Sequence, residues 1–436
     1  MKNWRETLST YFQKRMLCVL FLGFASGLPF GMLIDPLNFW LSESKIQRGA
    51  IGLISFVTLT YSFKAVWAPF IDRLKLPILG SWLGQRRSWL VFSQLLIAMS
   101  LLGLGLSDPA ESLRWLVIFA LAVGFTSATQ DICIDAMRIE LLEDSDQGNG
   151  AAMYIGGYRI AFLISQVVTF FIAGALGWSS AYLAISIFMG LLVVPTIYLI
   201  PEPKSFPRNQ KDILETPKAW FQEAYLEPFI DLASRYKKHL VLIILLIMTY
   251  KFSDIIMGTM AMPFYQEIGF TKDEIAIVTN TFGIAVTIIG GFLGGIILFR
   301  YGIMAGLLLG AIFVASSNLA FAFLSLVGAN VNVLAAVIAC DNLAQGLAAT
   351  ALVAYLSSLT HEKFTATQYA LLFLVATVPA KIIAGMSGFV VDSVGYFVFF
   401  LYASGMGIPA ICITLYFYRQ KKNNSQGKTH DEKAIC

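Results

Sequence analysis

The sequence predicts an all-α membrane protein with twelve transmembrane helices in two six-helix bundles, and three observations carry this prediction. First, 57% of the 436 residues are hydrophobic and only 13% are charged, whereas soluble proteins have about 25% charged residues. Second, apolar runs of about 20 residues recur along the chain, each long enough to cross a bilayer as a helix. Third, one long polar connection, residues 201–238, separates six of these runs from the other six.

The apolar runs are interpreted as helices because none shows the alternating pattern of a strand, and an open sheet cannot exist in lipid. In chain order the predicted spans are 16–40, 50–72, 88–107, 113–137, 150–175, 178–200, 239–264, 274–299, 302–327, 331–358, 367–391 and 396–418. The first follows several basic residues and extends to Trp40, which is too long for the apolar region of a signal peptide. We therefore expect an uncleaved first span.

The charges outside the spans predict the orientation of the chain. Both termini and every second loop together carry 23 Lys and Arg residues, and only four fall on the other side, namely Lys45, Arg48, Lys272 and, at the edge of the fourth span, Arg114. By the positive-inside rule the first side is cytoplasmic. Both termini are therefore expected in the cytoplasm, which fits an even number of spans.

This layout divides the chain into four regions. They are an N-terminal six-helix bundle (1–200), a cytoplasmic linker (201–238), a C-terminal six-helix bundle (239–418) and a disordered polar tail (419–436). Within the linker, apolar side chains recur at helical spacing among polar ones, at Phe221, Tyr225, Phe229, Ala233 and Tyr236. This pattern predicts an amphipathic helix on the membrane surface, and a partly ordered tether is the alternative.

Glycines recur at four-residue spacing in the first span, at Gly23, Gly27 and Gly31. Three glycines on one helix face let the backbone of another helix approach closely. Close packing is the interpretation we favour, and a bending point for gating next to Pro29 is the alternative.

At least nine ionisable side chains lie inside the predicted spans, where a charge is expensive and usually faces a cavity or relays protons. The cations are Lys64, Arg159, Lys251 and Lys381, and the acids are Asp35, Asp131, Asp135, Asp254 and Asp341. The cations are candidate ligands for an anionic substrate, Arg159 and Lys251 above all. A carboxylate desolvated in such a cavity can take up a proton near neutral pH, so the acids are candidates for proton coupling. Ion pairs that only fix helix packing are the alternative for any single residue.

Sequence spacing relates some of these residues to each other. Asp131 and Asp135 are four apart and share a helix face, whereas Lys251 and Asp254 are three apart and can pair within their own helix. Tyr158 stands beside Arg159 and Tyr250 beside Lys251. Their rings are candidates for stacking on the apolar faces of sugars, although core or interfacial placement is favoured for each ring taken alone.

The loop between the second and third spans carries a candidate conformational latch. It contains Asp72-Arg73, then Gly80, then Arg86-Arg87. This order of residues is similar to the cytoplasmic signature loop of the major facilitators, and the resemblance implies that the acid can cap the N-terminus of a helix from the other bundle, which here would be the eleventh span. Ordinary cytoplasmic placement of the basic residues is the alternative.

Taken together, these strings resemble the AmpG-type permeases, the bacterial importers of muropeptides within the major facilitator superfamily. The matching strings are LGFASGLP at 22–29, DR at 72–73, SATQDICIDA at 127–136, GYR at 157–159, YKFSD at 250–254 and FTATQYALL at 364–372. The loop after Asp72 is similar to the signature loop of major facilitators, although several extra residues follow Gly80. The arrangement of six plus six spans is also typical of that fold, in which two bundles are related by an axis along the membrane normal.

The resemblance implies a proton-coupled symporter in the bacterial inner membrane. It would import N-acetylglucosaminyl-anhydromuramyl peptides from the periplasm to the cytoplasm for peptidoglycan recycling. Another anionic solute, such as acetyl-CoA or a peptide, is the alternative. The expected partners are the sugar-peptide, protons and the lipid bilayer, and we expect a monomer that binds no nucleic acid.

Other classes of protein find less support in the sequence. No GxxxxGK[ST] loop occurs, which argues against direct drive by ATP. The five cysteines and three histidines show no metal-binding spacing, so no cofactor is expected. A membrane enzyme would rest on His361 beside Glu362 alone, and we expect no enzyme.

Overall fold

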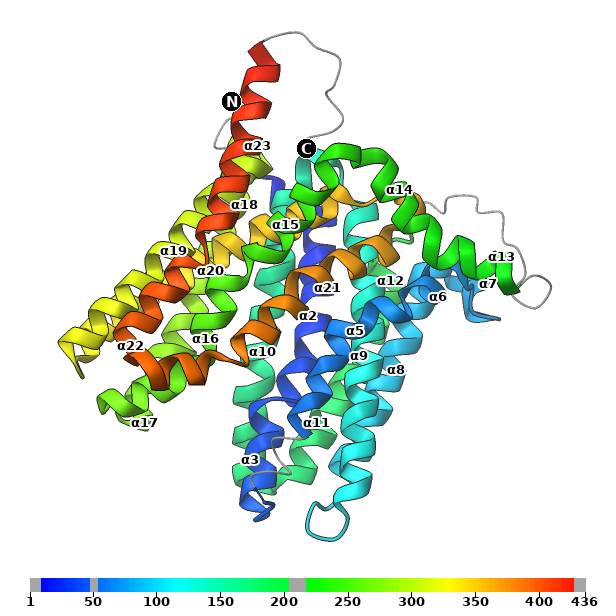
Figure 1. Ribbon diagram of the computed structural model, residues 1–436. Helices are drawn as coiled ribbons and strands as arrows, with labels where there is room; N and C mark the ends of the chain where they lie inside the picture. The colour runs from blue at the N-terminus through cyan, green and yellow to red at the C-terminus, as the bar shows by residue number, and fades with distance from the viewer. Residues whose placement is uncertain (1–8, 48–53, 204–216, 427–436) are drawn as a thin grey trace.

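The computed structural model describes residues 9–47, 54–203 and 217–426, and all regular structure in these ranges is helical. Figure 1 shows the helices in two groups, the N half (residues 9–203) and the C half (residues 237–426), joined by a helical linker. We call the end of the molecule that carries the linker the linker face and the opposite end the far face. The predicted fold class is confirmed.

The N half contains the first six spans, of which the second is broken. Its helices are α2 (Lys14–Met32), α3 (Asp35–Glu43), η1 (Ser55–Leu59), α5 (Thr60–Phe63), η2 (Lys64–Val66), α6 (Ala68–Arg73), α7 (Leu79–Leu83), α8 (Gln85–Gly105), α9 (Leu113–Leu141), η3 (Asp144–Asp146), α10 (Gln147–Leu176), α11 (Trp178–Leu191) and α12 (Val193–Leu199). The predicted second span corresponds to four short pieces, η1 to α6, rather than to one helix.

The C half contains the last six spans. Its helices are η5 (Lys237–His239), α15 (Leu240–Tyr250), α16 (Phe252–Ile268), α17 (Lys272–Ile275), η6 (Ala276–Phe282), α18 (Gly283–Tyr301), α19 (Ile303–Val327), α20 (Val331–Leu359), η7 (Glu362–Phe364), α21 (Thr365–Ala384), α22 (Ser387–Gly405) and α23 (Ile408–Gln426). The eleventh span passes from α21 into the first residues of α22, and the chain turns at Gly395, whose φ is 75°. This positive φ is one that glycine adopts without strain.

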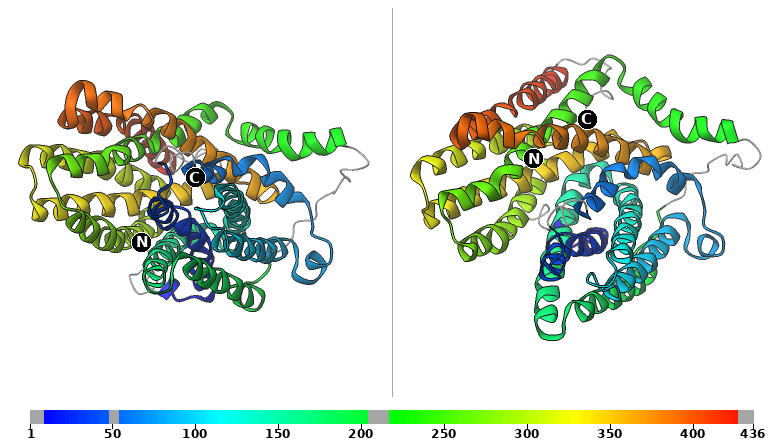
Figure 2. Two further views of the ribbon diagram at one scale, coloured as in Figure 1. Left: turned by 90° about the horizontal axis from the view of Figure 1, so that it is seen from below. Right: turned by 60° about the horizontal axis from the view of Figure 1, so that its bottom comes forward.

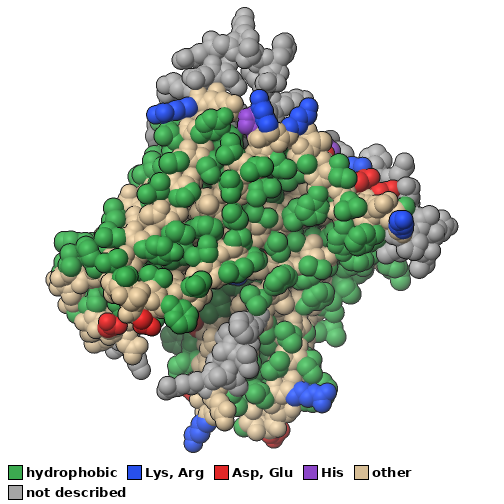
Figure 3. All heavy atoms as spheres, viewed as in Figure 1, with side chains coloured by type: hydrophobic (Ala, Val, Ile, Leu, Met, Phe, Trp, Pro, Cys, Tyr) green, Lys and Arg blue, Asp and Glu red, His purple; other side chains and the backbone are tan. Residues whose placement is uncertain are grey.

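Eleven helices among the described residues are long and apolar enough to cross a membrane. The missing twelfth is the broken second span, part of which lies outside the described residues. The surface is also typical of a membrane protein, because Figure 3 shows charged side chains gathered at the two ends of the molecule and a largely hydrophobic belt between them. The protein is therefore a multi-pass membrane protein.

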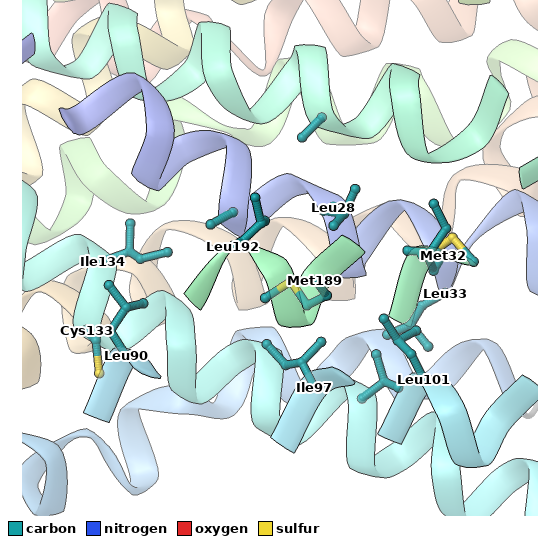
Figure 4. Packing of buried hydrophobic residues seen from close by; sticks show 14 of the residues in the cluster. Leu28, Met32, Leu33, Leu90, Ile97, Leu101, Cys133, Ile134, Met189 and Leu192 are labelled. Carbon is teal, nitrogen blue, oxygen red and sulfur yellow. The ribbon is translucent and has the colours of Figure 1, made fainter. Parts of the chain in front are cut away.

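Each half has its own apolar core. In the N half, Leu28 and Met32 of α2 pack with Ile97 of α8 and Met189 of α11 (Figure 4), and all four are buried. The glycines of the first span let α2 lie directly on α10, because a Cβ at Gly23 or Gly27 would collide with carbonyl oxygens of α10. The predicted close packing is therefore confirmed.

The two halves approach each other most closely near the linker face. In Figure 1 their lower ends, at the far face, diverge, and Figure 2 shows the helices of the C half inclined to those of the N half. One line of contact runs between α10 and α18, where a Cβ added at Gly295 would meet Ala152. The other runs along α21 and is part of the candidate site.

The linker forms a helix whose buried face differs from the predicted one. It consists of α13 (Pro217–Phe221), a π-helical turn η4 (Gln222–Leu226) and α14 (Glu227–Tyr236). The buried side chains are Trp220, Ala224, Pro228, Leu232 and Tyr236. Of the predicted stripe, Tyr236 is buried but Phe221 and Phe229 are exposed. From Trp220 to Leu232 the buried stripe lies one residue earlier than predicted and faces the protein.

The polar tail is helical where the structure describes it. Helix α23 continues to Gln426, so residues 419–426 are not disordered as the sequence led us to expect. Residues 427–436 lie outside the described residues.

Candidate functional site

A buried ion pair joins the broken second span to α9 in the N half. The Lys64 Nζ lies 2.7 Å from the Asp135 Oδ2, and only 5% and 4% of the two side chains are exposed. The chain is 3₁₀-helical at Lys64 and changes to α-helix at Ala68, so this break brings the lysine to the face of α9 that carries Asp135. Removing one member of such a pair leaves an uncompensated buried charge, which costs about 3–5 kcal/mol.

Asp131 lies one helical turn from Asp135 but has different partners. Its Oδ1 accepts a hydrogen bond of 2.6 Å from the Ser26 hydroxyl, which also lies 3.3 Å from the Tyr154 hydroxyl. Among the described residues no cation lies within 4 Å of this carboxylate. A carboxyl group without a cationic partner can be neutralised by a proton instead, so the two acids of α9 are suited to different roles.

The C half holds a second group of ionisable side chains. Lys251, at the junction of α15 and α16, pairs with Asp254 at 2.6 Å, as their spacing suggested. Asp341 of α20 accepts hydrogen bonds from Ser317 (2.8 Å) and Gln345 (2.7 Å). Within the described chain Asp341 has no cation within 4 Å. Each half therefore contains one buried carboxylate that is bound only by neutral groups.

Helix α21 lies along the second span and joins the two halves through a series of contacts, which we call the α21 seam. From the linker face inward, Thr367 contacts Asp72, the Phe373 ring lies 5.0 Å from the Lys64 Nζ, and the Lys381 Nζ donates to the Ser62 hydroxyl at 2.8 Å. The seam therefore places Lys64 and Lys381 between the halves.

Asp72 caps the N-terminus of α21 from the other half. Its Oδ2 accepts from the Thr367 amide (2.7 Å) and hydroxyl (2.6 Å), and its Oδ1 accepts from the Ala366 amide at 3.3 Å. Arg86 holds this carboxylate at 2.8 Å and also pairs with Glu140 at 2.7 Å. The contact therefore lies at the helix end that the sequence suggested.

The other basic residues of this loop contact neighbouring segments. Arg73 pairs with Glu223 of the linker, and Arg87 donates to carbonyl groups of Ile197 and Ile200. Glu202 accepts from the amides of Arg86 and Arg87 at the start of α8, at 2.8 Å each. Partial burial raises the pKa of the Glu202 carboxyl, and these two hydrogen bonds oppose the rise.

Other predicted site residues lie apart from these clusters. Asp35 begins α3 after the turn at Leu33, is exposed, and accepts from Gln166 at 2.6 Å. The Tyr250 hydroxyl points into the core of the C half, toward the Leu307 carbonyl (3.2 Å). The Tyr158 ring packs against Phe30.

Arg159 is half-buried, and among the described residues it has no hydrogen-bond or ion-pair partner. It lies three residues beyond Gly156, where an added Cβ would meet the Phe292 ring of α18. Residues three apart share a helix face. Arg159 is therefore on the face of α10 that faces the C half, one turn closer to the far face.

One buried cation was not among the predicted site residues. Arg138 was placed in a loop because the fourth span was expected to end at residue 137, but α9 continues to Leu141. Its side chain is fully buried between the halves and donates to the Ser357 hydroxyl at 2.9 Å. Helical spacing is the signal that would have found it, since Asp131, Asp135 and Arg138 recur every three or four residues.

Comparisons with known proteins agree with this architecture. The family model of the Major Facilitator Superfamily matches residues 15–253 and 242–434. Transporter AmpG 4 of Rickettsia conorii is 33% identical over 405 residues, which cover 92% of this chain and 96% of that protein. The anhydromuropeptide permease of Escherichia coli is 31% identical over 412 residues, or 94% of this chain and 81% of the permease.

Solved structures show the same fold at much lower sequence identity. The proton:xylose symporter XylE has a TM-score of 0.66 at 15% identity, with 94% of this chain and 96% of that one covered. The human organic anion transporter TETRAN has a TM-score of 0.65 at 14% identity, with 92% and 99% covered. From its sequence, fold and relatives, the chain belongs to the major facilitator superfamily and, within it, to the AmpG-type permeases, so it is a membrane transporter and not an enzyme.

Proposed function

We propose that the protein is a proton symporter that imports anhydromuropeptides, from the periplasm at the far face to the cytoplasm at the linker face. The substrate is suggested by the name of the Escherichia coli relative, anhydromuropeptide permease. The orientation of the chain is suggested by the excess of Lys and Arg on the side of the linker, and import is what the resemblance to the muropeptide importers implies. In a bacterium the proposed location is the inner membrane, with both termini in the cytoplasm.

The observation that carries the proposal is the contrast between the two acids of α9. Asp135 is held by Lys64 at 2.7 Å, whereas Asp131 is bound by the Ser26 hydroxyl. Asp131 is therefore the proton site in this proposal, and Asp135 fixes Lys64. Asp341 offers a second site of the same kind in the C half.

Transport in this proposal requires the α21 seam to open. The Asp72 contact with α21 closes the linker face in the present conformation, while the far ends of the halves diverge (Figure 1). Rocking one bundle against the other around a central site is the usual movement in this fold. Opening the linker face would separate Asp72 from Thr367 and Lys64 from Phe373.

Among the candidate ligands for the peptide carboxylates, Arg159 is the strongest. It has no partner to displace among the described residues, whereas Lys251 is bound to Asp254 and Lys64 to Asp135. Its position on the face of α10 toward the C half puts it between the two halves, where substrate would pass in this proposal. Tyr158, the neighbouring ring, is a weaker candidate because it packs within the N half.

Uptake into proteoliposomes tests the proposal. Labelled anhydromuropeptide is offered with and without an inward proton gradient, to the unmodified chain, to Arg159→Ala and to Arg114→Ala, which removes an exposed arginine at the start of α9. We expect gradient-dependent uptake that falls by roughly 10- to 150-fold in Arg159→Ala, as for the loss of a hydrogen bond to a charged group, and is unchanged in Arg114→Ala.

Each other outcome has a defined meaning. Uptake that does not respond to the gradient would refute proton coupling. Competition by acetyl-CoA, but not by unlabelled muropeptide, would favour the alternative substrate. Binding without uptake would mean that the protein is a sensor rather than a carrier.

A further inference from the structure

Arg138 is a fully buried cation at the boundary between the halves. It belongs to α9 of the N half, but its hydrogen-bond partner is Ser357 of α20. Its guanidinium lies over two rings, Tyr154 of α10 at 5.5 Å and Tyr369 of α21 at 5.3 Å. Two helices from each half therefore enclose this one group.

The guanidinium has fewer partners than its burial requires. It carries five N–H donors, yet neither Nε nor Nη2 has a hydrogen-bond partner among the described residues. The nearest carboxylate oxygen, Asp135 Oδ1, is 4.0 Å from Nη2, beyond hydrogen-bonding distance. The Tyr369 hydroxyl also interacts with the group without satisfying these two nitrogens.

A buried guanidinium with two unsatisfied nitrogens contributes little to holding two helix bundles together. A buried guanidinium that lacks hydrogen-bond partners destabilises a protein, and apolar side chains of similar volume often pack there equally well or better. The two free nitrogens lie on one edge of the planar guanidinium, the edge that binds a carboxylate through two parallel hydrogen bonds. The side chain is therefore equipped to bind an anion.

The position of Arg138 determines when an anion can reach it. Along α9 it lies between Asp135, which pairs with Lys64, and Glu140, which pairs with Arg86 beside the Asp72 contact. Both of its C-half neighbours, Ser357 and Tyr369, belong to helices that must move away when the linker face opens. Opening would separate the guanidinium from Ser357 and expose it to the substrate path between the two halves.

We propose that Arg138 binds a carboxylate of the substrate on the linker-face side of the path, once the α21 seam has opened. This inference rests on the proposed function and adds to it a residue, a substrate group and a stage of the cycle. Arg159 would meet the substrate nearer the far face, and Arg138 would hold it before release.

The charges around Arg138 relate this anion to the proton. Lys64 and Arg138 balance Asp131 and Asp135 in the described cluster, so a proton on Asp131 leaves one positive charge. One substrate carboxylate at Arg138 restores neutrality. Proton and anion therefore favour each other's binding, and both leave together at the linker face.

Selectivity for the charged form of the substrate tests the inference. Uptake of anhydromuropeptide with free peptide carboxylates is compared with uptake of the same compound with amidated carboxylates, in the unmodified chain, Arg138→Gln and Arg138→Lys. Arg114→Gln is the control for an exposed arginine. We expect the unmodified chain and the control to prefer the free acid.

In Arg138→Gln the free acid should lose about tenfold or more in uptake, as when a charged hydrogen bond is lost, while the amidated form is unchanged. Arg138→Lys should recover part of the preference, since it keeps the charge without the planar fork. If Arg138→Gln does not fold, Arg138→Lys alone must still show a reduced preference.

Two results would overturn the inference. Equal loss of both forms would show that Arg138 has only a structural role, and no preference in the unmodified chain would show that no carboxylate is recognised. These results differ from failure of the proposed function, in which the unmodified chain takes up neither form.

Discussion

Replacing Asp72 by Asn should shift the protein toward a state that is open at the linker face. The carboxylate receives three hydrogen bonds from the start of α21, at 2.7, 2.6 and 3.3 Å. Its contact with Arg86 does not affect the equilibrium between the closed and open states, because both residues belong to the N half and stay together in either state. Asn keeps the volume and an acceptor but loses the charge.

The magnitude follows from what the charge contributes at that helix end. A partly buried charge at a helix terminus is worth up to about 2 kcal/mol, and charge-assisted hydrogen bonds are roughly twice as strong as neutral ones. A loss of about 2–3 kcal/mol shifts the equilibrium by roughly 30- to 150-fold.

Thiol accessibility measures this shift. Ala370 of α21 is buried against the core of the N half, so a single cysteine at this position, in a chain with its native cysteines replaced, is shielded while the seam is closed. We expect its alkylation from the linker face to accelerate in Asp72→Asn and not in Asp108→Asn, which alters an exposed aspartate near the far face. An unchanged rate in folded Asp72→Asn would refute the reasoning.

Three further predictions concern the N half. Asp131→Asn should abolish accumulation driven by a proton gradient but retain exchange of substrate across the membrane, and loss of both activities would contradict its role as the proton site. Lys64→Gln should destabilise the protein by about 3–5 kcal/mol in thermal unfolding, and adding Asp135→Asn should recover most of this loss because it removes the carboxylate that Lys64 had paired with. Gly157→Ala should destabilise by about 1–3 kcal/mol, because its Cβ would collide with a carbonyl oxygen of α2. Gly174→Ala, with nothing within 4 Å of the added Cβ, should be neutral or stabilising, and a similar loss in both would contradict the packing argument.

Much of the architecture could be predicted because it depends on properties that the sequence displays directly. The length of the apolar runs gives the spans, and the long linker gives the two halves. The cap on α21 was predicted from the resemblance of the Asp72 loop to the signature loop of the major facilitators, and the positive end of a helix favours a carboxylate there. The Lys251–Asp254 pair follows from spacing alone.

Other parts of the site depend on where helices end and how they face each other. Arg138 was missed because α9 extends past the limit of the apolar run, which hydropathy cannot show. The partnership of Lys64 with Asp135 connects two spans, and no spacing in the chain encodes it. Asp35 lies within the first candidate membrane span, as predicted. Its exposure at the start of α3 was not predicted, because the turn at Leu33 leaves no clear mark in composition.

The two lines of contact between the halves differ in chemistry, and this difference suggests which of them the halves rotate about. Along α10 and α18 the contacts are mostly apolar, as at Gly295 and Ala152, although the Tyr11 hydroxyl donates to the Phe292 carbonyl beside them, so these surfaces can move over each other while breaking few polar bonds. Along the α21 seam the contacts are directional and charged. The α10–α18 contact is therefore suited to act as a hinge, and the α21 seam is suited to act as the latch that holds the linker face closed. Compounds or mutations that act on the α21 seam would change how often the linker face opens. Larger side chains at the α10–α18 contact would instead prevent one half from rotating against the other.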